Sequence, residues 1–115
     1  MTGDLISEVA SNLFENMSNK FQLFDNYPNP FNPKTKISYI IPSDQLVELK
    51  IIDMLGREVN RLVFEQQEQG RYQIEWDGKD QRGNLVASGI YLYQLKAGNY
   101  VNTRKLLFLK LMSLL

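Results

Sequence analysis

The chain has 115 residues, which is enough for one domain and too short for two of ordinary size. Its residues are 43% hydrophobic and 11% aromatic, so it has enough apolar surface to fold. Thirteen basic and thirteen acidic residues cancel, so no whole-molecule field attracts nucleic acid or an anionic membrane. Histidine and cysteine are both absent, which excludes disulfides, zinc-thiolate sites and the commonest general base. The composition therefore favours a non-catalytic domain with no cofactor and no bound metal.

The first segment, residues 1–20, carries apolar side chains at helical spacing. Leu5, Val9 and Leu13 lie four residues apart, and Asp4 can cap the start. We expect a short N-terminal amphipathic helix, with a linker from a larger protein as the alternative. The segment lacks a basic start and an unbroken apolar run, so we expect any export signal to lie upstream. The sequence has no run of about 18 apolar residues that would predict a membrane span.

Residues 21–33 contain three of the four prolines of the chain, within the stretch NYPNPFNP. Proline fixes φ, removes a backbone donor and pushes the preceding residue toward extended geometry. The pattern predicts a rigid, extended segment leading into the domain, with Tyr27 and Phe31 holding it against a hydrophobic surface. A stiff linker is the alternative.

After the prolines the hydrophobic period becomes two, which is typical of strands with one buried face. Gly56 and Gly98 stand at two of the expected turns. Short strands at spacings of roughly 8 to 12 residues predict an all-β antiparallel sandwich of about seven strands. The expected strands cover residues 37–41, 47–51, 58–64, 72–76, 85–87, 91–95 and 100–109.

Two patterns suggest chemistry and are better explained by structure. The loop 77–84 offers Asp77, Asp80 and Asn84 as oxygen ligands, but their spacing does not fit a calcium-binding loop, and turn formation is favoured. Trp76 with the tyrosines at 72, 91 and 93 could stack on a sugar or a base, yet aromatic side chains alternating along strands are mostly core. No pair of carboxylates stands out for acid–base catalysis.

The C-terminal run from Arg104 to Leu115 is apolar at both alternating sets of positions. It is therefore either a strand buried on both sides or a strand with an exposed apolar edge. Lys105 and Lys110 bracket its apolar stretch, which makes it a candidate for capture by strand addition.

Five segments occur in a characteristic order over roughly residues 21–110. Together they resemble the C-terminal sorting domain, type A, of type IX secretion cargo, and they are similar to the immunoglobulin-like domain of the flagellar hook-capping protein. The segments are NYPNPFNP at 26–33, IIDMLGREV at 51–59, WDG at 76–78, ASGIY at 87–91 and TRKL at 103–106.

The resemblance implies a seven-stranded immunoglobulin-like sandwich over residues 34–110 that acts as a tag on a larger secreted protein. It further implies transit through the periplasm to the cell surface, with an outer-membrane translocon and a sortase as partners besides the upstream cargo domain. Two of the residues in the fourth segment also have a structural explanation: Gly89 permits a bend, and Tyr91 fills the core. The recognition residues on this analogy are Gly89, Tyr91, Lys105, Leu106 and Lys110.

The chain departs from the family pattern at its end. Family members usually stop at or just after the final lysine, whereas this chain continues with an apolar extension over residues 111–115. That extension and the apolar N-terminal segment also suggest a homodimer formed through the termini. The competing function is a structural or adhesive module that packs on neighbouring domains or self-associates.

Overall fold

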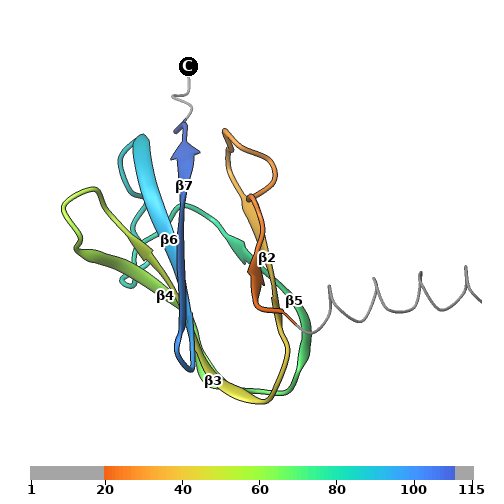
Figure 1. The fold of residues 1–115 in the computed structure, drawn as a ribbon. Helices are drawn as coiled ribbons and strands as arrows, with labels where there is room; N and C mark the ends of the chain where they lie inside the picture. Colours follow the sequence, from red (N-terminus) through yellow and green to blue (C-terminus); the bar gives the residue numbers. More distant parts are fainter. Residues whose placement is uncertain (1–19, 111–115) are drawn as a thin grey trace, which may run out of the picture.

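Two antiparallel sheets face each other in the computed structural model, which describes residues 20–110 (Figure 1). The smaller sheet contains β1 (Gln22–Leu23), β2 (Thr35–Ile41) and β5 (Gly70–Trp76) in the order β1-β2-β5. The larger sheet has the order β4-β3-β6-β7. Its strands are β3 (Gln45–Ile52), β4 (Glu58–Gln67), β6 (Gly89–Ala97) and β7 (Tyr100–Phe108). The described residues contain seven strands and no helix, as the all-β immunoglobulin-like prediction requires.

The period of two in the sequence corresponds to the two faces of each strand. In β3 the side chains of Val47, Leu49 and Ile51 are buried, and the residues between them lie on the outer face. The same alternation in β2 and β6 supplies inner faces that pack against each other across the sandwich. The buried core consists of Leu23, Phe31, Ile37, Tyr39, Ile41, Val47, Leu49, Ile51, Val63, Trp76, Tyr91, Tyr93, Leu95, Ala97, Leu106 and Phe108.

Tight turns join strands where the sequence places glycine. The β3–β4 turn is closed by Asp53, whose Oδ1 accepts hydrogen bonds from the backbone N–H groups of Leu55 and Arg57, while Gly56 has a φ of 85°. Gly98, with a φ of 60°, lies in the two-residue hairpin loop between β6 and β7. The chain passes from one sheet to the other three times, between β2 and β3, between β4 and β5, and between β5 and β6.

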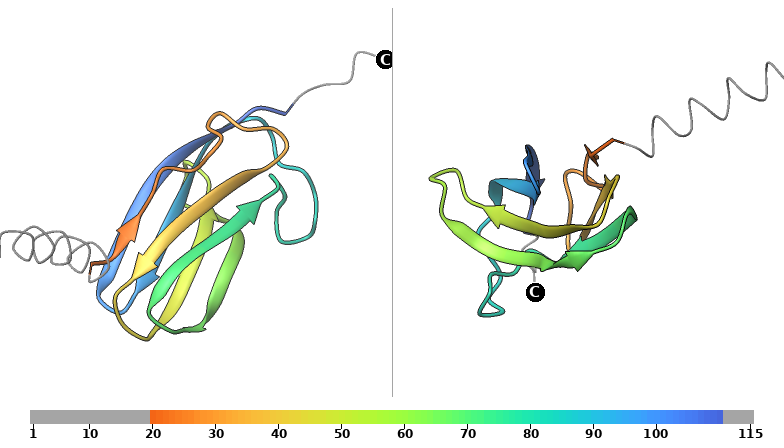
Figure 2. Two further views of the ribbon diagram at one scale, coloured as in Figure 1. Left: turned by 90° about the vertical axis from the view of Figure 1, so that its right-hand side faces the viewer. Right: turned by 60° about the horizontal axis from the view of Figure 1, so that its bottom comes forward.

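The proline-rich segment differs from its expected extended form. It contains β1, which pairs antiparallel with β2, so the chain reverses direction between residues 24 and 34. Phe31 is buried in the core, as a pinning side chain should be. The Tyr27 side chain is 79% exposed and packs on no hydrophobic surface, although the Tyr27 backbone forms a bridge to Lys36. Residues 21–33 are therefore part of the sandwich, and Figure 2 shows β1 beside β7 at the edge of the two layers.

Two further expectations have different outcomes. The short strand expected over residues 85–87 is wrong, because Leu85 makes only an isolated bridge to Lys79. The total of seven strands is nevertheless as expected, because β1 is an additional strand. The sequence pattern missed β1 because it is two residues long. The expected N-terminal helix and the extension 111–115 lie outside the described residues.

Candidate recognition surface

The β6–β7 hairpin positions the residues expected to carry recognition. In its register Gly89 lies opposite Phe108, Tyr91 opposite Leu106, and Leu92 opposite Lys105. Neighbouring pairs alternate between the two faces of the sheet. The hairpin therefore brings Gly89, Tyr91 and Leu106 together at the core, and places Lys105 on the outer face.

Tyr91 and Leu106 have packing roles in this structure. Tyr91 is 8% exposed and Leu106 is 1% exposed. The Tyr91 ring meets the Trp76 ring edge-on at a centroid distance of 5.6 Å, and its hydroxyl donates a hydrogen bond of 2.7 Å to the Ala87 carbonyl. Burial raises the pKa of this phenol, and the charge of Asp53 adds to that rise, so the hydroxyl remains a neutral donor. Leu106 cannot contact a partner unless the sandwich opens, and Tyr91 exposes only a small part of its side chain, in a surface depression beside Asp53.

The remaining three residues are accessible to different degrees. Gly89 begins β6 with a φ of 154° and is half-buried, so a side chain there would be strained by the backbone even though space is free. Lys105 and Lys110 are both exposed. Of the five expected recognition residues, the lysines are the two whose charged groups are presented to a partner.

The end of β7 is held in a fixed position by two segments, residues 29–31 and Ser88. The Phe31 N–H donates to the Leu107 carbonyl and the Leu109 N–H donates to the Phe31 carbonyl, which makes a short parallel bridge. The Leu107 N–H donates to Asn29 Oδ1, and the Lys110 N–H donates to the Ser88 hydroxyl at 2.7 Å. The lysines are therefore presented from a backbone with defined geometry.

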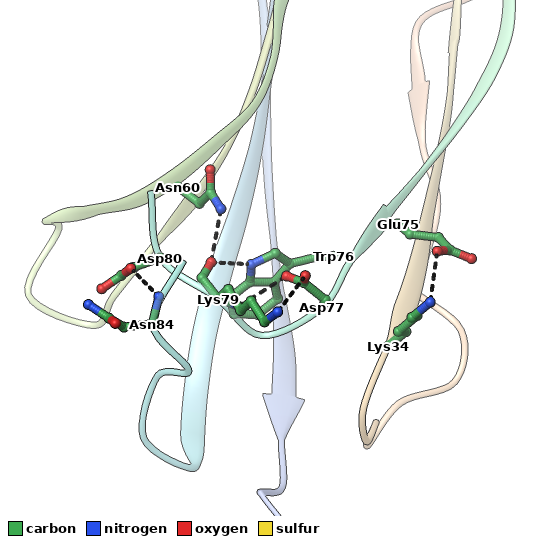
Figure 3. A network of polar contacts seen from close by, with 8 residues as sticks. All are labelled: Lys34, Asn60, Glu75, Trp76, Asp77, Lys79, Asp80 and Asn84. Atoms are coloured by element: carbon green, nitrogen blue, oxygen red, sulfur yellow. Dashed lines mark hydrogen bonds and ion pairs between the residues drawn. The ribbon is translucent and has the colours of Figure 1, made fainter. Parts of the chain in front are cut away.

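The WDG turn supports this end of the hairpin from inside. The Trp76 indole N–H and the Asn60 side-chain amide both donate to the Lys79 carbonyl, each at 2.9 Å (Figure 3). Gly78 lies directly beneath the Phe108 ring, which contacts Phe31 at a centroid distance of 5.0 Å. Only glycine leaves room for that ring, so the turn and the end of β7 are packed as one unit.

The sequence alternatives for sugar and metal binding find no support in this geometry. Trp76 and Tyr93 are fully buried, so the described part of the chain has no exposed platform built on Trp76. Asp80 Oδ1 accepts hydrogen bonds from the N–H groups of Arg82 and Asn84, as turn formation predicts. Within residues 20–110 no group of three or more acidic side chains could hold a metal ion.

A depression of about 550 Å³ lies between two turns of the same construction. Asp53 with Gly56 builds one turn, and Asp80 with Gly83 builds the other; in both, the aspartate Oδ1 accepts hydrogen bonds from N–H groups two and four residues later. The Arg57 guanidinium also donates to Asp53 Oδ2 at 2.7 Å. Backbone hydrogen bonds from Arg57 are the main reason that the pKa of Asp53 is lowered. Both carboxylates are engaged by their own turns.

The sequence reasoning missed an exposed apolar patch on the outer face of the larger sheet. Ile90 is 47% exposed, and Leu109, just beyond β7, is 44% exposed. The signal was available, because the residues between the buried positions of β6 and β7 are themselves apolar. We define the outer patch as four apolar residues of this face, leaving out Leu109: Ile90, which is exposed, and Ile52, Leu92 and Leu107, which are half-buried.

Comparisons with known proteins agree with the fold. The FlgD Ig-like domain family matches residues 33–100. The structure is similar to FlgD from P. aeruginosa, with a TM-score of 0.51 and 31% identity over 64% of this chain and 58% of that one. No curated protein sequence matches the chain.

Two structures from Porphyromonas gingivalis share the fold at 20% identity. The first, dimeric latent PorU, has a TM-score of 0.62 over 77% of this chain and 9% of PorU. The second, PorZ, has a TM-score of 0.53 over 78% of this chain and 11% of PorZ; it is described as an essential bacterial surface component of the type IX secretion system. The chain thus spans about a tenth of each and somewhat over half of FlgD. Within the described residues no helix has the length and apolar character needed to cross a membrane.

Proposed function

The chain belongs to the FlgD Ig-like domain family, and we propose that it is a non-catalytic immunoglobulin-like module that directs a larger secreted protein through type IX secretion to the cell surface. Its partners are the outer-membrane translocon, a sortase and the upstream cargo domain, and it needs no cofactor. The protein passes through the periplasm and ends at the cell surface or outside the cell. The complete lack of histidine and cysteine supports the non-catalytic part of the proposal.

The observation that carries the proposal is the fixed presentation of two lysines at the end of β7. Lys105 and Lys110 are exposed, while the apolar residues between them are held by Phe31, Asn29 and Ser88. A receptor gains affinity when its target is ordered before binding, because less conformational entropy is lost. The chain also shares its fold with PorZ, which is described as a surface component of a type IX secretion system.

The test is secretion of a reporter fused in front of residues 21–115 in a bacterium that has a type IX system. We expect the reporter at the cell surface, and we expect Lys110→Glu to leave it in the periplasm because the charge offered to the translocon is inverted. Lys36→Glu is the matched control, since Lys36 is exposed on the other sheet. Periplasmic retention of the unaltered fusion, or equal export of both variants, would contradict the proposal.

Point variants are needed because deletion of the end of the chain would mislead. Removing residues 106–115 takes Leu106 and Phe108 out of the core, so a loss of export would report unfolding as readily as a lost signal. Each variant should therefore be purified, and its folding checked by the fluorescence of Trp76, the single tryptophan.

The second candidate is a structural or adhesive module that packs on neighbouring domains or self-associates, and the exposed outer patch favours it. In that case Lys110→Glu leaves export unchanged, whereas charged substitutions within the outer patch change association or stability. The same set of variants therefore separates the two functions.

A further inference from the structure

The outer face of the larger sheet has a regular pattern of side chains across its four strands. Three successive rows run from β4 through β3 and β6 to β7, as the registers of the three strand pairs define them. The rows are Glu58–Ile52–Leu92–Lys105, Arg61–Lys50–Gln94–Thr103 and Phe64–Glu48–Lys96–Val101. The first row ends in opposite charges, Glu58 and Lys105. The third row ends in two apolar residues, Phe64 and Val101.

We infer that this face binds the same face of a second copy of the chain. The twofold axis runs parallel to the strands, between β3 and β6. Such an axis places each β4 residue over the partner's β7 residue of the same row, and each β3 residue over the partner's β6 residue. The facing pairs are Glu58 with the partner's Lys105, Ile52 with the partner's Leu92, Arg61 with the partner's Thr103, Lys50 with the partner's Gln94, Phe64 with the partner's Val101 and Glu48 with the partner's Lys96.

No like charges face each other in this arrangement. A twofold axis perpendicular to the strands would instead place Lys50 over itself and Arg61 over itself, and would set the charge of Glu48 against Ile52. Like charges and unpaired charges across an interface are costly, so the first axis is selected. Sheets of two domains pack well with their strands nearly aligned, which this axis also gives.

Several side chains of this face are exposed or lack an ion-pair partner among the described residues, so they are available for such contacts. Phe64 is 55% exposed and Val101 is 51% exposed, and these two apolar residues stand at the two ends of the third row. Lys105 and Lys96 form no ion pair within residues 20–110. Glu58 has one weak contact, at 3.5 Å to Arg61, and is free to turn toward a partner. Glu48 is already paired with Lys50 and Arg61, so it adds little to the association.

Three rows of four side chains are fewer than the about 20 to 30 residues on each side of a standard interface. We therefore expect a reversible dimer with a micromolar dissociation constant. The contact differs from a homodimer formed through the apolar termini, and it does not depend on the proposed sorting function.

The test is sedimentation equilibrium of the full chain over about 1 to 500 µM. We expect a monomer–dimer equilibrium, and we expect Glu58→Lys and Lys105→Glu each to weaken the dimer at least about tenfold through like-charge contact. The double exchange Glu58→Lys with Lys105→Glu should restore the dimer, because the two charges are then swapped. Glu68→Lys and Lys36→Glu are the matched controls, since they make the same charge changes at exposed positions off this face.

An apolar variant provides a second, independent measurement. Val101→Glu should disrupt the dimer, whereas Leu85→Glu, at a position of similar exposure in the loop before β6, should not. A chain that stays monomeric over the whole concentration range overturns the inference, and so does a dimer that neither single charge variant weakens. The double exchange keeps Lys105 replaced, so restored dimerisation with lost export would separate this contact from translocon recognition.

Discussion

Gly78 provides the sharpest test of how the fold holds the end of β7. Its φ of 75° lies in the region that side chains disfavour, and a Cβ built there would be 2.7 Å from Phe108 Cζ and 2.9 Å from Cε1. Contacts that short cannot persist, so Gly78→Ala must move either the turn or the ring. The Phe108 ring is fully buried between Phe31 and Trp76, with centroid distances of 5.0 and 6.1 Å, and cannot retreat easily.

The expected loss of stability has two parts. The left-handed backbone costs about 1 to 2 kcal/mol for a residue with a Cβ. Forcing an extra methyl group into a packed core costs about 1 to 3 kcal/mol. Gly78→Ala should therefore lower the free energy of unfolding by about 2 to 5 kcal/mol, a large part of the about 5 to 15 kcal/mol that is typical of a domain.

Comparison with Gly83→Ala isolates the packing cost of Gly78→Ala. Gly83 has a φ of 87°, and a Cβ built there has no neighbour within 4 Å, so only the backbone cost applies. The two variants should differ by about 1 to 3 kcal/mol in urea unfolding followed by Trp76 fluorescence and by circular dichroism. Equal losses in the two variants would refute the idea that the WDG turn and the end of β7 are packed as one unit.

Two further predictions concern buried tyrosines. Tyr93→Phe removes the hydrogen bond of 2.6 Å that the Tyr93 hydroxyl donates to the Phe24 carbonyl across the two sheets. This variant should lower the free energy of unfolding by about 1 to 2 kcal/mol. Tyr72→Phe should cost less in the same urea titration, because the Tyr72 hydroxyl donates to the exposed Glu68 carbonyl. Burial raises the pKa of Tyr39 and of Tyr93 from 10.0 to about 12, so their stabilising contribution is complete below pH 10 and is lost as the pH rises toward 12. Urea unfolding at about pH 8 and about pH 11 should show a smaller loss in Tyr39→Phe than in the unaltered chain, and equal losses would count against the burial argument.

The period of two predicted most of the sandwich because it reports directly which side of a strand is buried. It identified β2 through β7 within a few residues, and the glycines at 56 and 98 marked real turns. It could not identify β1, because two residues carry no period. It also predicted a strand over residues 85–87, where the chain finds no neighbouring strand to pair with.

The recognition residues illustrate the same limit. The sequence could place Lys105 and Leu106 next to each other, but alternation puts one on the outer face and the other in the core. Which of the two is accessible depends on the sheet across the sandwich, and no local pattern contains that sheet. The matched rows of the outer face depend in the same way on the registers of three separate strand pairs.

By itself, the sequence determined that this chain is an all-β domain, with its turns and most of its strands. These properties follow from local chemistry: the side-chain period and glycine at turns. Only the tertiary structure decided that Phe31 belongs to the core and Tyr27 does not, and that Gly78 must leave room for Phe108. It also decided that the exposed lysines sit at an end of β7 held by Phe31 and Ser88. Phe31 reaches β7 only when the two sheets close on each other, and Ser88 reaches Lys110 only when β6 pairs with β7.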